Sequence, residues 1–178
     1  MADEHVAAEL EHFLAGRADQ LLRTATLLAG SREAGQDLLQ TALERLLRHW
    51  ARLDGDPEAY LRRTLYNLAT DGFRRQGRLQ RKLLLLRAGA QPGSDPAAQV
   101  DLRDALVRLL IQLPPRQRAV LVCRYWEQLT EAETADLLGW PPGTVKSAAS
   151  RGLRRLRDLA GRWQQAELHE TGSRGSGR

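Results

Sequence analysis

Apolar residues recur three or four positions apart along almost the whole chain, which is the spacing of one face of an α-helix. No stretch alternates apolar and polar residues over the length of a strand. Aromatic residues, which favour strands, make up only 5% of the sequence. We therefore predict an all-α fold with about five to seven helices and no β-sheet.

The first block of this pattern predicts a bundle of three helices over residues 1–77. Gly30 ends the first helix, and the second ends near Trp50. The third starts at Asp56 and Pro57, because aspartate caps a helix and proline is tolerated in its first turn. The expected apolar faces are, in order, Leu21, Leu22, Ala25 and Leu28; Leu38, Leu39, Ala42, Leu43, Leu46 and Leu47; and Leu61, Leu65, Leu68 and Phe73.

The helical pattern fails after Gly77. Residues 78–95 begin basic, contain one apolar run at Leu83–Leu86, and end in Gly, Pro and Ser. This composition predicts a flexible linker between two small helical domains. The role of Leu83–Leu86 stays open between a docking segment and a helical extension.

The second block predicts a further helical domain over residues 96–165. One helix runs up to Pro114, and the next begins at about Arg116. The polar residues 166–178 are expected to be a disordered tail. The helix from Arg116 is predicted to turn these side chains inward: Val120, Leu121, Cys123, and Tyr125 or Trp126.

A helix-turn-helix pattern follows within the second block. Thr130 and Glu133 have the spacing of a capping box, which marks a helix N-terminus. Gly139 can end this short helix in the left-handed conformation, and by Thr144 the chain has entered another helix. Two helices joined by a tight glycine-containing turn make a helix-turn-helix. The inner side of the first is predicted to carry Ala132, Ala135 and Leu138.

Charge differs across the turn. Acidic residues precede it, at Glu127, Glu131, Glu133 and Asp136, and basic residues follow it, at Lys146, Arg151, Arg154, Arg155, Arg157 and Arg162. The spacing places Lys146, Ser147 and Arg151 on one side of the second helix, where such a helix enters the major groove of DNA. The opposite side carries Val145, Ala149, Leu153 and Leu156. The alternative is a surface helix with merely solvated arginines, but the turn, the capping box and the one-sided charge together favour DNA binding.

The composition and motif content argue against a metal-binding, catalytic or membrane-spanning protein. The net charge is +5 over 178 residues, and the single cysteine with four scattered histidines forms no zinc-binding spacing. No phosphate-binding loop, nucleophile elbow or HExxH motif occurs, so we expect no catalysis and no cofactor. The chain also lacks a signal peptide pattern and an apolar run long enough to span a membrane. We expect a cytoplasmic protein.

Two blocks resemble a known family. The segment LPPRQRAVLVCRYWEQLTEAETADLLGWPPGTVKSAASRGLRRLR resembles the promoter −35-binding domain of bacterial extracytoplasmic-function (ECF) sigma factors. In the first block, AGSREAGQDLLQTALERLLRHW is similar to the family's helix that binds core RNA polymerase. DPEAYLRRTLYNLATDGFRRQ is similar to its −10-recognition helix. The actinobacterial-type branch is the most similar.

The resemblance implies a role for each domain and for particular residues. The partners would be promoter DNA and core RNA polymerase, through its β′ clamp helices and β flap. Many family members are also held by anti-sigma factors, and the sequence identifies none for this chain. The residues that match are, for core polymerase, Asp37, Leu38, Gln40 and Leu43; for the −10 element, Arg62, Arg63, Asn67, Arg74, Arg75 and Arg78; and for the −35 element, Thr144, Lys146, Ser147, Arg151, Arg154 and Arg155.

The sequence departs from the family at the recognition helix. Pro141 stands where many members have a capping serine, a loss of about 1 kcal/mol at that helix end. Ala148 stands where many carry Arg or Gln, and Ser150 where some have an aromatic residue. We therefore expect −35 readout to depend more on Lys146, Ser147 and Arg151.

Two other kinds of protein could contain a helix-turn-helix or basic helices. A conventional helix-turn-helix repressor or activator would bind duplex DNA without polymerase and would not need the polymerase-binding helix or Asn67. A structural helical adaptor would not explain two basic helices. Cys123 lies on an apolar helix face, which indicates a core residue rather than a redox sensor.

Overall fold

The structure is a computed structural model that describes residues 13–76 and 102–174. For residues 72–76, 102–104 and 163–174 it describes the backbone alone. Every regular element in these ranges is helical, which confirms the all-α prediction. The predicted linker at 78–95, including Leu83–Leu86, lies outside the described residues. The elements are α2 (Ala18–Ala29), α3 (Arg32–His49), η1 (Trp50–Arg52), α4 (Pro57–Gln76), α6 (Leu102–Ile111), α7 (Pro115–Leu121), η2 (Val122–Trp126), α8 (Glu131–Leu138) and α9 (Pro142–Arg174).

Helices α2, α3 and α4 form the first domain, and local signals set their ends. Gly30 closes α2 with φ 94°, and its N–H donates to the Thr26 carbonyl. The Ser31 hydroxyl caps α3 by accepting from the Ala34 N–H at 3.1 Å. An Asp56 carboxylate oxygen accepts from the Glu58 N–H at 2.9 Å at the start of α4. The helix boundaries predicted near Gly30 and Asp56 are therefore confirmed.

Helix α3 packs against α2 at a glycine. A Cβ added to Gly35 would lie 2.8 Å from both the Cα and the backbone N of Thr26, which is too close for any side chain. Backbone atoms cannot swing aside as a flexible side chain can. Only glycine therefore allows the two helices to approach this closely.

In the second domain, α7 ends in a wide π-helical turn, η2. The Glu127 N–H donates to the Val122 carbonyl, five residues earlier, at 3.0 Å. The wider turn changes the direction of the following side chains. The prediction that Tyr125 or Trp126 turns inward is wrong, since they are 58% and 36% exposed. Cys123, at the start of the same turn, is fully buried as predicted.

Helices α8 and α9 differ from expectation in two details. Ala132 is exposed, because the buried side of α8 consists of Thr134, Ala135 and Leu138. Helix α9 continues to Arg174, beyond residue 166 where a disordered tail is expected. The segment from Ala166 to Glu170 is rich in strong helix formers, which favours continuation of the helix.

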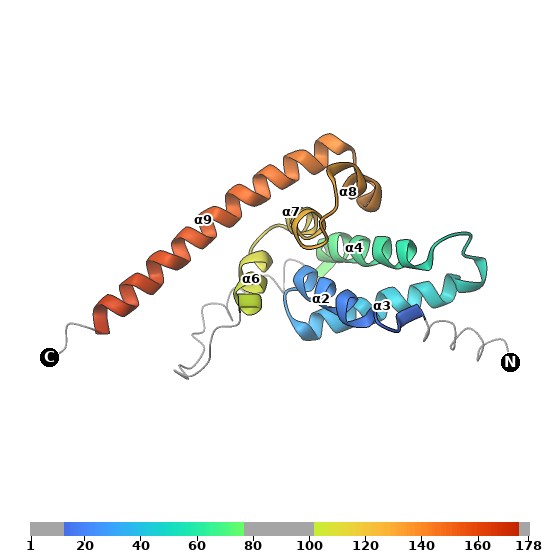
Figure 1. Cartoon of the computed structure of the whole chain (residues 1–178), viewed down its shortest axis with the longest axis horizontal. Coiled ribbons are helices and arrows are strands. Elements are labelled where there is room, and N and C mark those ends of the chain that lie inside the picture. Colours follow the sequence, from blue (N-terminus) through green and yellow to red (C-terminus); the bar gives the residue numbers. More distant parts are fainter. Residues whose placement is uncertain (1–12, 77–101, 175–178) are drawn as a thin grey trace.

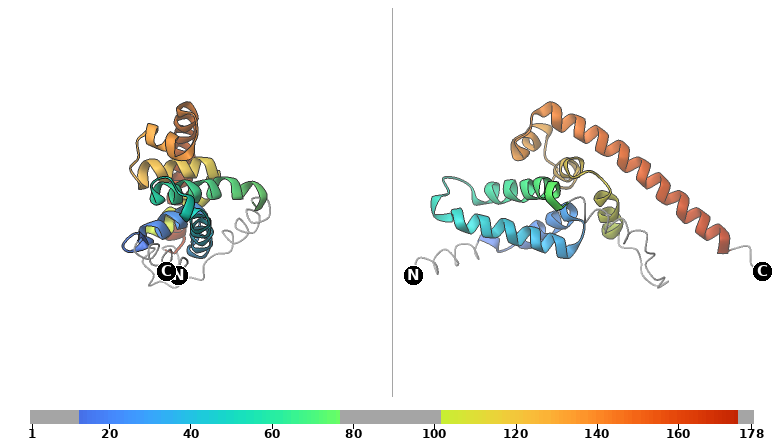
Figure 2. Two further views of the ribbon diagram at one scale, coloured as in Figure 1. Left: turned by 90° about the vertical axis from the view of Figure 1, so that its right-hand side faces the viewer. Right: turned by 180° about the vertical axis from the view of Figure 1, so that it is seen from behind.

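The two domains pack against each other, with α4 between them. Helix α4 contacts α2 and α3 within its own domain, and α7 and α8 of the second domain. Figures 1 and 2 show α3 on the side of α4 away from α7 and α8, and α9 as a long arm extending from the second domain. Helix α2 also meets α6, where a Cβ on Gly30 would lie 2.2 Å from Cδ1 of Ile111.

Replacing Gly35 with alanine should destabilise the protein by about 1–3 kcal/mol, because the new methyl group pushes the backbone of α2 away from α3. Chemical denaturation followed by circular dichroism measures this change. The matched control is Gly161→Ala on α9, where nothing lies within 4 Å of the added Cβ. This control should be neutral or more stable by up to about 1 kcal/mol. Equal stability of the two variants would contradict the close approach.

Alkaline pH should destabilise the protein. Burial raises the pKa of the Cys123 thiol from its ordinary 9.0 to about 11 and raises the pKa of the buried Tyr66. The folded state holds these protons more tightly than the unfolded state does. Their contribution to the free energy of unfolding is therefore complete below the unfolded pKa of the thiol, 9.0, and is lost as pH rises towards about 11. Urea unfolding across this range measures the decline. Cys123→Ala, which removes the thiol, should show a shallower decline, and an equal slope would contradict the prediction.

Candidate nucleic-acid and polymerase interfaces

Helices α8 and α9 form the predicted helix-turn-helix. The Thr130 hydroxyl accepts from the Glu133 N–H at 3.2 Å, and Glu133 Oε2 accepts from the Thr130 N–H at 2.7 Å. The capping box is therefore confirmed, and its hydrogen bonds from Thr130 lower the pKa of the Glu133 carboxyl. Gly139 ends α8 with φ 65°, the left-handed conformation predicted for it. These local contacts fix the turn that orients α9.

The double proline starts α9 through the backbone. Pro142 occupies the first turn of the helix. The carbonyl of Pro141 accepts from the Thr144 N–H at 2.8 Å and from the Val145 N–H at 3.2 Å. Proline has no side-chain acceptor for the free N–H groups at this end, so rigid φ angles replace the usual side-chain cap.

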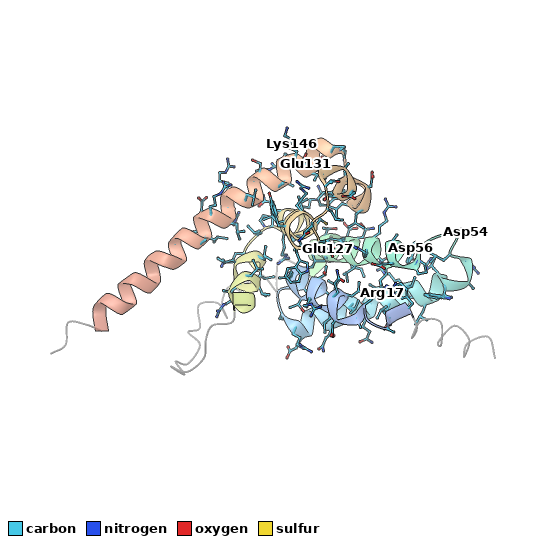
Figure 3. All side chains as sticks on the ribbon, in the orientation of Figure 1. Arg17, Asp54, Asp56, Glu127, Glu131 and Lys146 are labelled. Atoms are coloured by element: carbon cyan, nitrogen blue, oxygen red, sulfur yellow. The ribbon has the colours of Figure 1, made fainter. Side chains whose placement is uncertain are left out.

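The outer side of α9 carries the predicted −35 residues. Lys146, Ser147 and Arg151 are exposed, and Thr144 is half-buried. Lys146 points away from the rest of the molecule at the start of the helix (Figure 3). The opposite side is buried at Val145, so the predicted division of the helix into two faces holds here.

Ala148 belongs to the buried side of α9, being only 4% exposed. Its burial contradicts the interpretation, drawn from the family resemblance, that Ala148 is a base-reading position without a long side chain. A helix advances 100° per residue, so Ala148 and Val145, three positions apart, share the face that packs on the domain.

Ser147 and Arg151 interact with each other. The Ser147 hydroxyl donates to the Thr144 carbonyl at 3.0 Å. Arg151 donates from Nη2 to the Ser147 hydroxyl at 3.2 Å and from Nε to the Ser147 carbonyl at 3.1 Å. The guanidinium therefore lies back along its own helix, and the two side chains form one polar unit.

Arginines continue along α9 beyond the first turns. Arg154 and Arg155, predicted for the −35 element, are exposed. An open hollow between α7 and α9 is lined by Gln117, Arg151, Arg154, Arg155, Asp158 and Arg162. Beyond Arg151, the hollow brings three further guanidinium groups, those of Arg154, Arg155 and Arg162, near one carboxylate, a balance that suits phosphate groups.

The predicted −10 residues lie on α4, and two of them contact the second domain. Arg62 forms an ion pair with Glu127. The Arg63 Nη2 donates to the Asp136 carbonyl at 3.0 Å, while Asn67 is exposed. The sequence offers no signal for these contacts, because the paired residues are far apart along the chain. Of two other predicted residues, Arg74 and Arg75, the structure describes only the backbone, and Arg78 lies outside the described residues.

The predicted polymerase-binding residues lie on α3. Asp37 and Gln40 are exposed, and Leu38 and Leu43 are half-buried against the core. Gln40 donates to the Glu44 carboxylate one turn on, at 3.2 Å. Leu47, predicted for the apolar face of this helix, is 41% exposed. It lies one turn after Leu43 and so extends this surface.

Comparison with known proteins gives the family. Residues 15–79 match the family model described as Sigma-70 region 2, and residues 103–156 match Sigma-70, region 4. The chain is 39% identical over 152 residues to the RNA polymerase sigma-E factor of Streptomyces coelicolor, covering 84% of this chain and 85% of that protein. It is 34% identical over 144 residues to the ECF RNA polymerase sigma factor SigM of Mycobacterium tuberculosis, covering 80% and 72%. The chain belongs to the ECF sigma factors.

A solved structure shares the fold of this sigma factor. The sigma factor RpoE from Bartonella quintana, in complex with the anti-sigma factor NepR, matches with a TM-score of 0.60 at 22% identity. The match covers 85% of this chain and 96% of that chain. It supports the all-helical architecture, and the sequence relatives confirm the resemblance to the actinobacterial-type branch.

No group of three or more His, Cys, Asp or Glu side chains in the described ranges could hold a metal ion. Among the same residues, no helix has the length and apolar character needed to cross a membrane.

Arg151→Ala should weaken binding of the polymerase holoenzyme to the −35 element by about 1–3 kcal/mol if Arg151 contacts a base. Titration of duplex promoter fragments measures the loss. The control is Arg157→Ala, which removes another exposed arginine of the same helix outside the arginine-lined hollow. A loss confined to one −35 sequence indicates base contact, whereas equal losses for the two variants would contradict a special role for Arg151.

Proposed function

We propose that this sigma factor binds core RNA polymerase, places its two domains on the −35 and −10 promoter elements, and promotes strand opening for transcription initiation. One observation carries the proposal. The chain has both sigma-factor domains. The first exposes a polar face on α3, and the second exposes the basic side of α9, the second helix of the helix-turn-helix. It would act in the cytoplasm, with no catalytic activity and no cofactor of its own.

The −35 element would be read by the start of α9. Lys146 and the Ser147–Arg151 unit are the exposed polar groups of its first turns, and the first turns of such a helix enter the major groove. The arginines further along would contact phosphates, which fix the position of the protein without reading sequence. Sequence specificity would thus come from the first turns of α9, and affinity from phosphate contacts would come from its later turns.

The −10 element would be recognised on α4. A stacked base cannot enter a pocket, and unstacking one costs a few kcal/mol. Contacts from Asn67 and the neighbouring arginines to the separated strand would offset this cost. The protein would therefore favour melting by binding the open form of the promoter more tightly than the duplex, without nucleotide hydrolysis.

The domain roles follow the same division. Residues 1–77 would bind core polymerase and the −10 element, residues 96–165 would bind the −35 element and the β flap, and residues 78–95 would connect them. An anti-sigma factor is a further partner that we propose, since the Bartonella quintana relative in fold was solved with one. The identity of such a partner is a separate question from promoter recognition.

Mapping transcription start sites tests this function directly. The purified chain is added to core polymerase, and specific starts that are absent with core alone support the proposal. The chain on its own should bind duplex promoter fragments poorly. Tight polymerase-free binding to a duplex operator, together with no binding to core, would instead support a conventional helix-turn-helix regulator.

Charge reversal on α3 should disrupt the polymerase contact. Asp37→Lys should weaken binding to core polymerase by roughly 1–3 kcal/mol if its carboxylate meets a basic partner group. Fluorescence anisotropy of the labelled chain titrated with core measures the affinity. Asp54→Lys makes the same charge change at an exposed residue beyond the end of α3 (Figure 3) and should bind as the parent does. Equal weakening by both variants would indicate a general charge effect.

A further inference from the structure

A row of alternating charges lies where the two domains meet. Arg17 pairs with Glu58 at 3.1 Å, Arg62 lies 3.9 Å from the other oxygen of Glu58, and Arg62 also pairs with Glu127. Glu127 comes from the second domain, and the other three residues come from the first. The side chain of Glu127 is only 6% exposed, so its charge is held largely away from water.

Glu127 is bound by two helices of the first domain. Its Oε2 pairs with Arg62 of α4, and its Oε1 accepts from the Thr24 hydroxyl of α2 at 3.0 Å. Figure 3 shows Glu127 in the interior, between the two domains. A buried carboxylate that loses its partner is strongly destabilising, so this contact resists separation unless both charges find new partners or water.

Two further residues on the same side of α4, Arg63 and Tyr66, also contact the second domain. Arg63 donates to the Asp136 carbonyl of α8 at 3.0 Å. Tyr66, one turn further, is fully buried next to the Cys123 thiol of the second domain. The second domain therefore engages Arg62, Arg63 and Tyr66 along one stripe of the helix.

The polymerase-binding face of α3 is left open in the same arrangement. Asp37, Gln40 and Leu47 are exposed. Helix α3 packs mainly on α2 and α4 (Figure 1). Core polymerase could thus reach α3 while the two domains remain packed together.

We propose that Glu127 is an intramolecular competitor of promoter DNA for the arginines of α4. Its carboxylate holds the Arg62 guanidinium that would otherwise neutralise a phosphate of the −10 strand, so the closed protein is autoinhibited. This inference rests on the proposed −10 role of Arg62 and Arg63.

The competition follows from charge chemistry. A guanidinium binds a carboxylate or a phosphate through the same donor groups, so Arg62 cannot serve both fully. When the domains separate, Glu127 returns to water and a phosphate can replace it on Arg62. Any partner that holds the domains apart, as polymerase would by binding each of them, removes the competitor and exposes the DNA-binding stripe.

The test measures DNA binding by the full chain without polymerase. The probe is a fluorescein-labelled oligodeoxythymidine of about 12 nucleotides, because phosphate contacts do not depend on sequence. Glu127→Gln keeps the shape of the side chain and removes the charge. It should bind the probe about fivefold more tightly than the parent, or better.

The matched control is Glu131→Gln. It makes the same change in net charge in the same domain, at an exposed residue of α8 that lies outside the charge row (Figure 3). An equal gain in both variants would overturn the proposal, because the gain would then reflect net charge alone. The gain of Glu127→Gln should also disappear in an Arg62→Ala background, and a gain that persists there would equally overturn it.

Small-angle X-ray scattering provides a second readout that does not involve DNA. Glu127→Gln should increase the radius of gyration at an unchanged helix content, and an unchanged radius would contradict release of the domains. If this variant fails to fold, Thr24→Val removes only the hydroxyl that donates to Glu127. It should shift both measurements in the same direction by a smaller amount, and no shift would count against the proposal.

These outcomes are distinct from those that test the function itself. Loss of promoter-specific initiation by the parent chain with core polymerase would refute the proposed function. The effects of Glu127→Gln on probe binding and on shape could still appear in that case. Conversely, normal initiation by the parent together with no difference between Glu127→Gln and Glu131→Gln would leave the function standing and refute the competition.

Discussion

The packing of α4 is the constraint on which the rest of the structure depends. This helix contacts α2 and α3 on one side and α7 and α8 on the other, so both domains use it to bury apolar surface. Leu61, Leu65 and Tyr66 are fully buried along it. Burial of this kind is the main favourable term in folding, and it cannot be lost on one side without exposing core residues. The two domains therefore cannot separate without exposing apolar side chains of α4.

The same helix carries the residues proposed to meet the −10 strand, which gives it two conflicting tasks. Arginines that face a second protein surface are satisfied there, and arginines that face DNA must be free to contact phosphate. The Arg62–Glu127 ion pair joins these tasks in one contact. Under the proposed competition, polymerase would supply the binding energy that separates the domains, and the free protein would keep its α4 arginines covered.

Much of the local structure could be predicted from the sequence. The Thr130–Glu133 capping box, the left-handed Gly139 and the start of α4 at Asp56 depend on residues only a few positions apart, so their chemistry is visible in the chain itself. One expectation that failed concerns helix length, since α9 continues past residue 166, and the others concern which way a side chain faces. Tyr125 faces outward because of a π-helical turn for which the sequence contains no recognisable motif. Ala148 faces inward because of the way α9 is rotated against its domain.

The sequence by itself therefore determined the helices, their caps, the helix-turn-helix and the family, since all of these arise from short-range patterns and residue types. Only the tertiary structure decided how the two halves meet. Thr24 and Glu127 are 103 positions apart, and nothing near either residue specifies the other as its partner. Their contact depends on the combined packing of α2, α4 and η2, whose relative positions are set by burial across the whole molecule rather than by local preference.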